Sequence, residues 1–139
     1  LFSAARSEFK HMEYFYFHNC LYESVWNNNQ RRHASRTDTW KLLHTYPPDY
    51  KVIFVGDASM SPFEITHPGG SVEHFNEEAG LVWLQRVTAT YERVIWLNPA
   101  PEKHWHYTPS TDLISRTFEG RMFPLTLEGL DRAMKSLLR

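Results

Sequence analysis

The pattern of apolar and polar positions predicts strands and helices that alternate along most of the chain. Two short apolar runs, 51–55 and 93–97, are rich in β-branched residues and are continuous rather than alternating. Continuous runs of this kind are typical of strands buried on both faces, as in a parallel sheet that is covered by helices. We therefore expect both runs to lie inside a parallel sheet.

Helical spacing marks the segments around these strands. A helix is predicted from Thr37-Asp38-Thr39 to the pair Pro47-Pro48, because Thr or Asp before an apolar stretch is a helix start signal. A second helix is predicted over 76–91 and a third over 108–118. The helix over 76–91 places four apolar residues on one face: Ala79, Trp83, Val87 and Tyr91.

The end of the chain is predicted to hold a short strand over 121–125 and a final helix that Thr126 caps. One stripe of this helix is apolar, and its members are Leu127, Leu130, Met134, Leu137 and Leu138.

The first third of the chain is predicted to be less regular. Residues 1–10 show helical spacing, and the aromatic segment 13–19 is typical of a strand. Residues 21–26 are predicted to form its hairpin partner, entered through a turn at 19–20. The polar segment 27–36 is predicted to be a loop.

This order predicts a single α/β domain over 1–139, with a doubly wound, mostly parallel, Rossmann-like sheet and helices on both faces. The carboxyl ends of parallel strands meet at one edge of such a sheet, where ligands bind. We expect Asp57, Asn98 and the start of the Thr37 helix to share that edge. The long irregular segment 58–75 has the length of loops that are often functional.

Composition narrows the possible partners. The formal net charge of −1 gives no general attraction to nucleic acid or to an anionic membrane. The basic run at 30–33 is too short to change this expectation. No apolar run approaches the roughly 20 residues of a membrane span. The single cysteine, Cys20, excludes an internal disulfide, and we expect a soluble, cytoplasmic protein.

The residues with the most distinctive chemistry directly follow the first buried run. Asp57, Ser59 and Ser61 form an Asp-x-Ser-x-Ser string. One carboxylate and two hydroxyls suit a hard cation such as Mg²⁺, which keeps several waters and needs few protein ligands. The alternative is a turn in which Asp57 only caps the local backbone. Thr37 is a further candidate ligand, because the start of its helix is predicted to lie at the same edge of the sheet as Asp57. It could also be a helix cap and nothing more.

Other chemistry has weaker support in the sequence. His104 and His106 could lie on one side of an extended segment, but no cysteine or close third histidine completes a zinc site. His67 and His74 flank a Pro-Gly-Gly turn without further ligands. Cys20 and His18 lack a third, orienting group for nucleophilic catalysis.

Five segments together resemble one family. They are 14–19 (YFYFHN), 36–39 (RTDT), 52–57 (VIFVGD), 94–99 (VIWLNP) and 124–130 (PLTLEGL). In this order they resemble a von Willebrand factor A (VWA) domain of the bacterial CoxE-like group, over nearly the whole chain.

The resemblance implies a non-catalytic, metal-ion-dependent adhesion site, with Thr37 and Asp57 among its Mg²⁺ ligands. Ser59 and Ser61 match no family ligand and remain possible local ligands. The family's usual partner is a MoxR-type AAA+ ATPase, which implies an adaptor role in maturation of a metalloenzyme or complex.

The first strand of the family and its metal loop are missing, so the domain is expected to be N-terminally truncated. In the family this strand lies in the sheet between the strands matched here by 13–19 and 51–55. We expect the chain to be a fragment, or the vacant place to be filled by a disordered piece or another molecule. The alternative is a Mg²⁺-dependent hydrolase or phosphotransferase that uses Asp57. A third interpretation is a scaffold domain whose metal site is degenerate.

Overall fold

A computed structural model describes residues 10–28, 33–69 and 77–138. Within these ranges the main sheet has three parallel strands in the order β3-β4-β5. The strands are β3 (Lys51–Val55), β4 (Arg93–Asn98) and β5 (Met122–Pro124). β3 pairs with β4 in the register Val55↔Leu97, and β4 pairs with β5 in the register Leu97↔Phe123. The predicted order of these strands and their parallel pairing are therefore confirmed.

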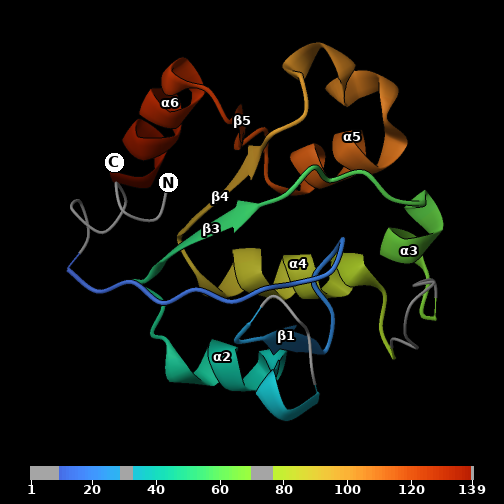
Figure 1. Ribbon diagram of the computed structural model, residues 1–139, viewed down its shortest axis with the longest axis vertical. Coiled ribbons are helices and arrows are strands. Elements are labelled where there is room, and N and C mark those ends of the chain that lie inside the picture. The colour runs from blue at the N-terminus through green and yellow to red at the C-terminus, as the bar shows by residue number, and fades with distance from the viewer. Residues whose placement is uncertain (1–9, 29–32, 70–76, 139) are drawn as a thin grey trace.

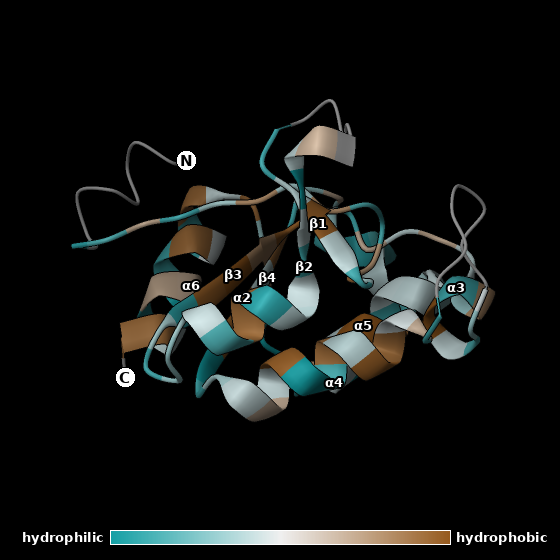
Figure 2. Cartoon of the chain, turned by 90° about the horizontal axis from the view of Figure 1, so that it is seen from below, coloured by the Kyte–Doolittle hydropathy of each residue, from teal (hydrophilic) through white to brown (hydrophobic). Residues whose placement is uncertain are grey.

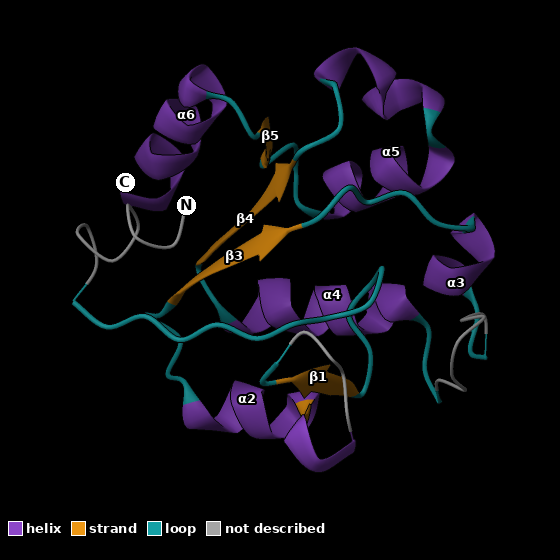
Figure 3. Cartoon of the chain, in the orientation of Figure 1, coloured by secondary structure: helices purple, strands orange, loops and turns teal. Residues whose placement is uncertain are grey.

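Helices cover both faces of this sheet, as Figures 1 and 3 show. On one face, α4 (Gly80–Thr90) and α5 (Pro109–Thr117) pack through Trp83 and Ile114 against Trp96. On the other face, α6 (Leu127–Leu138) packs its buried residues against Ile95 and Leu97. Hydrophobic colouring runs along β3 and β4 in Figure 2. The chain is thus an α/β protein with a parallel sheet flanked by helices.

Most of the predicted helices and strands are present, but several begin or end at other residues than predicted. α4 begins at Gly80, and its Ala79, Trp83, Val87 and Tyr91 are buried as predicted. The elements that were not predicted include α3 (Pro62–Thr66) and the 3-10 helix η2 (Glu102–Tyr107). No helix in the described ranges is both long enough and apolar enough to cross a membrane.

The apolar stripe predicted for the last helix is wrong at both ends. Leu127 is 89% exposed and Leu138 is 60% exposed. The helix instead buries Gly129, Ala133 and Leu137, because these positions face β4 and β5. The Thr126 cap is confirmed: its hydroxyl accepts from Gly129 N at 3.0 Å.

The N-terminal part forms a separate antiparallel ribbon. β1 (Ser24–Trp26) pairs with β2 (Arg36–Asp38), the latter preceded by the 3-10 helix η1 (His33–Ser35). The segment 27–36 is therefore not simply a loop, because its end pairs with β1. α2 (Thr39–Thr45) follows β2 and ends before the two prolines, but the side chain of its N-cap residue, Asp38, makes no capping hydrogen bond.

The segment 13–19 is extended but forms no full strand in the described structure. Isolated antiparallel bridges join Tyr16 to Trp26 and His18 to Cys20. The predicted turn is present, with Asn19 at a positive φ of 52°. The helix predicted over 1–10 falls almost wholly outside the described residues, as do residues 70–75 of the predicted irregular segment.

Candidate functional site

The loop that leaves β3 is held by side chains from neighbouring elements. Three successive carbonyls accept hydrogen bonds: Gly56 O from Trp96 Nε1 at 2.7 Å, and Asp57 O from Asn98 Nδ2 at 3.0 Å. The third, Ala58 O, accepts from Ser110 Oγ at 2.7 Å and from Thr111 Oγ1 at 3.0 Å. Because β4 and α5 both supply donors, the loop is fixed against two elements at the carboxyl edge of the sheet.

Ala58 lies at the centre of this loop in a strained conformation. Its φ is 56°, in the left-handed region, and the residue is only 1% exposed. An L residue in this region costs roughly 1–2 kcal/mol. Such strain persists only where the surroundings over-determine the backbone, and it is found most often at functional sites. The four donors described above meet that condition.

The carboxylate of Asp57 projects from the held loop. Asp57 and Ser59 are both exposed, and Asp57 Oδ1 accepts from Ser59 N at 2.9 Å. Ser61 caps α3, since its Oγ accepts from Phe63 N at 3.3 Å. Among the described residues, the second carboxylate oxygen of Asp57 and the hydroxyl of Ser59 have no hydrogen-bond partner. The Asp-x-Ser-x-Ser string therefore forms a turn, as the alternative interpretation predicted. It also presents oxygen atoms that are not used in hydrogen bonds among the described residues.

Thr37 is not brought to this loop. It lies in β2, and its hydroxyl donates to Asn27 Oδ1 at 3.3 Å. The β1–β2 ribbon lies on the other side of α4 from the carboxyl end of β3 in Figure 1. Within the described ranges, no hydrogen bond joins Thr37 to Asp57. The expectation that the start of α2 shares the edge is not met, whereas Asn98 lies there as predicted.

Histidine, cysteine and carboxylate side chains are the other candidates for metal ligands. In the part of the chain that the structure describes, no three of them lie close enough to hold a metal ion. His104 and His106 lie on η2, while His74 falls outside the described residues. Any cation at the Asp57 loop would therefore depend on one carboxylate and on hydroxyl oxygens.

A buried polar cluster anchors α3, which follows the loop. Glu64 is 2% exposed, and its carboxylate accepts from Asn19 Nδ2 at 3.2 Å. Burial raises the pKa of the neighbouring Tyr22 hydroxyl, with smaller contributions from Cys20 and Glu64. Burial also raises the pKa of the Cys20 thiol to about 12, so this thiol stays protonated and is a poor nucleophile. The cluster joins the turn at Asn19 to α3 and does not form a catalytic pair.

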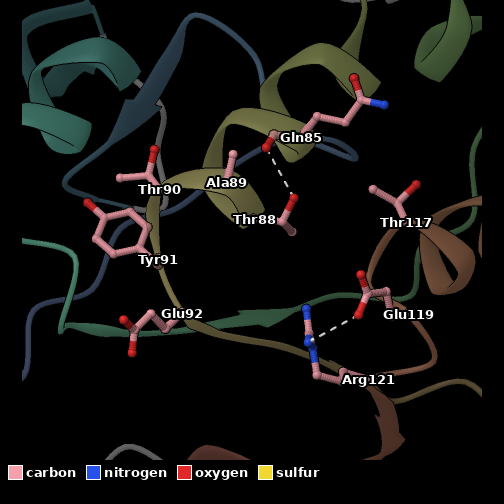
Figure 4. A pocket seen from close by; sticks show the side chains of 9 residues that line it. All are labelled: Gln85, Thr88, Ala89, Thr90, Tyr91, Glu92, Thr117, Glu119 and Arg121. Carbon is pink, nitrogen blue, oxygen red and sulfur yellow. Dashed lines mark hydrogen bonds and ion pairs between the residues drawn. The ribbon is translucent and has the colours of Figure 1, made fainter.

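A surface pocket of about 560 Å³ lies at the amino ends of β4 and β5, opposite the Asp57 loop (Figure 4). It is lined by Glu92 and Arg121, which precede β4 and β5, and by the ends of α4 and α5. Arg121 is already held by Glu119 at 3.7 Å and by its bond from Nε to Val94 O at 3.0 Å. We favour the Asp57 loop as the site, because ligands of open α/β sheets bind at the carboxyl ends of the strands.

Sequence reasoning missed the side chains that hold the loop. Ser110 and Thr111 follow Pro109 in the first turn of α5, and polar residues at a helix start beside the predicted edge are a usable signal. The indole donor of Trp96 gave no such signal, because a tryptophan in a buried strand is normally assigned to the core. Ala58 gave none either, since nothing in its side chain indicates a positive φ.

Asp57, Ser59 and Ser61 therefore lie together on one rigid loop, and Thr37 lies apart from them.

Comparison of the chain with protein-family models, with curated proteins and with solved structures found no match.

Proposed function

We propose that the chain is a non-catalytic protein-interaction domain of the doubly wound VWA type, which meets its partner at the carboxyl edge of the sheet. The observation that carries the proposal is the held loop with its strained Ala58 and its exposed Asp57 carboxylate. A rigid loop that presents one anionic group suits recognition through a shared cation. The sequence resemblance gives the partner, a MoxR-type AAA+ ATPase, and a cytoplasmic setting.

Exposed apolar side chains near this edge support an interaction surface. They lie in the segments that follow the three strands: Phe63, Tyr107, Leu125 and Leu127. Tyr107 is 77% exposed, in contrast to Trp105, whose indole donates to Ala100 O at 2.9 Å and packs inward. Exposed aromatic and aliphatic side chains of this size are typical anchors of protein interfaces.

The oxygens of the loop fit a hard cation but predict weak binding. Asp57 and the hydroxyl of Ser59 provide oxygen ligands only, which is the chemistry that Mg²⁺ prefers. One negative charge is little for a divalent cation, so the remaining positions would belong to water and to a carboxylate of the partner. Asp57 would hold the ion, and the backbone bonds of the loop would fix its position.

Calorimetric titration of the chain with Mg²⁺ tests this proposal. We expect weak Mg²⁺ binding that raises the midpoint of thermal unfolding, since a ligand that binds only the folded state stabilises it. Asp57→Asn should abolish both effects. Asp49→Asn is the matched control, because it makes the same change at an exposed residue that precedes β3; it should leave both effects unchanged.

Two results would contradict the proposal. Equal Mg²⁺ binding by Asp57→Asn would show that the ion does not use this loop. Hydrolysis of a generic phosphate ester that is lost in Asp57→Asn would instead favour the Mg²⁺-dependent hydrolase.

A further inference from the structure

The pocket at the amino ends of β4 and β5 lies apart from the Asp57 loop and plays no part in the proposed interaction (Figure 4). Its volume of about 560 Å³ is within the range that is usual for small-molecule sites. The end of α4, the end of α5 and the turn before β5 form its walls. The lining residues are polar or charged except for Ala89 and Tyr91, so a ligand must be recognised through hydrogen bonds and charge.

Arg121 supplies the pocket with a cation whose orientation the fold fixes. Its Nε donates to Val94 O at 3.0 Å, and its side chain is only 32% exposed. In the described part of the chain neither terminal nitrogen makes a hydrogen bond, and Nη1 lies 3.7 Å from Glu119 Oε2. Because the Glu119 side chain is largely exposed, solvent screens this long ion pair and it contributes little. The guanidinium therefore presents donors in the fork geometry that suits a carboxylate.

The last turn of α4, towards which Arg121 is directed in Figure 4, offers only acceptors to the pocket. No N–H of the described residues donates to the carbonyls of residues 88–90. The hydroxyl of Thr88 donates to Gln85 O at 3.1 Å, so its oxygen can only accept from a ligand. Glu92 follows the helix, and its exposed carboxylate has no partner among the described residues. Since a helix C-terminus also carries partial negative charge, this wall suits an ammonium group.

The two walls together select a ligand that carries both charges. An anion alone would be repelled by Glu92, Glu119 and the end of α4, and a cation alone would be repelled by Arg121. Arg121 is bonded to Val94, which is two residues beyond Glu92 and so at most roughly 7 Å along the chain from it. One small molecule can therefore reach both charged groups.

We infer that this pocket binds a small zwitterion of the amino-acid type. Its carboxylate accepts from the terminal nitrogens of Arg121. Its ammonium group donates to the carbonyls at the end of α4 and to Glu92. The pocket thus gives the chain a small-molecule site at the end of the sheet opposite to the Asp57 loop.

A titration of the 139-residue chain with γ-aminobutyrate, followed by backbone amide chemical shifts, tests the inference. Butylamine and butyrate are the matched probes, because each keeps the carbon chain and one of the two charges. We expect saturable shifts at residues 88–92 and at Arg121. The affinity for γ-aminobutyrate should exceed that for either single-charge probe by about tenfold or more, the effect of one additional charge-assisted hydrogen bond.

Three Glu→Gln substitutions at exposed residues separate the two ends of the ligand. Glu92→Gln removes a partner of the ammonium group and should weaken γ-aminobutyrate binding roughly two- to fivefold. Glu119→Gln removes the group that competes for Arg121 and should strengthen binding by a similar factor. Glu128→Gln makes the same change on α6, on the other face of the sheet, and should have no effect. Asp57→Asn should also have no effect, which separates this inference from the proposed cation site.

The inference is overturned by any of four results. They are the absence of saturable shifts at residues 88–92 and 121, binding of butylamine or of butyrate as tight as that of γ-aminobutyrate, undiminished binding by Glu92→Gln, or weaker binding by Glu119→Gln. The last result would show that the pocket responds to negative charge in general and not to the two ends of a zwitterion.

Discussion

The contribution of the side chains that hold the Asp57 loop to stability can be measured at the Ala58 carbonyl, which accepts from both Ser110 and Thr111. Ser110→Ala removes one of its two donors and also the acceptor of Met60 N, which lies 3.0 Å from Ser110 Oγ. An N–H that loses its partner in a buried site costs about 1–3 kcal/mol, so we expect the free energy of unfolding to fall by that amount. Thr111→Val keeps the shape of the side chain and removes only the second donor, and should cost about 1 kcal/mol or less.

The double variant gives the sharper result. With both donors gone, the buried Ala58 carbonyl has no hydrogen bond from the described side chains, so the combined loss should exceed the sum of the single losses by about 1–2 kcal/mol. Urea unfolding followed by tryptophan fluorescence measures all four proteins, with a constant m-value as the control for an unchanged folded state. If the single losses add to within about 0.5 kcal/mol, the two hydroxyls do not hold one carbonyl and the reasoning is refuted.

Three further predictions concern stability. Because burial raises the pKa of the Cys20 thiol from 9.0 to about 12, the folded state keeps a proton that the unfolded state releases. The free energy of unfolding should therefore fall as pH rises from about 9 towards 12, by up to about 1.4 kcal/mol per pH unit. Urea unfolding of Cys20→Ser should lack this contribution, and a pH dependence identical to that of the natural chain would contradict the prediction. In Gly129→Ala the new Cβ would lie 1.9 Å from Pro124 O, so α6 must shift and stability should fall by about 3 kcal/mol or more; an unchanged thermal midpoint would show that the helix adapts freely. Glu64→Gln keeps an acceptor for Asn19 and should stay within about 1 kcal/mol of the natural chain, whereas Glu64→Leu should lose about 1–3 kcal/mol in urea unfolding; equal losses would show that the hydrogen bond is not the cause.

The sequence allowed the core of the fold to be predicted because β4 is central. Every residue of β4 after Arg93 is buried, so its apolar run is uninterrupted and its structure follows from local pattern. β3 has the same kind of pattern but lies at an edge, and local pattern does not record which strand lies beside it. The exposure of Leu127 was missed for a related reason: helical spacing finds a stripe, whereas contact with β5 decides where that stripe begins.

The site was predictable only in part. The order of the strands placed Asp57 and Asn98 at one edge, as the structure confirms. Thr37 was expected there too, but its strand pairs with β1 in a separate ribbon, and sequence alone does not reveal that pairing. Ser110 and Thr111 act through a backbone carbonyl, which no residue-type pattern identifies.

The most direct test of the central proposal is the binding of the chain to a MoxR-type AAA+ ATPase, measured by calorimetry with Mg²⁺ and again with EDTA. We predict binding that needs Mg²⁺ and that Asp57→Asn abolishes, while Asp49→Asn binds like the natural chain. Equal binding in EDTA, or undiminished binding by Asp57→Asn, would contradict a cation-mediated interaction at the carboxyl edge.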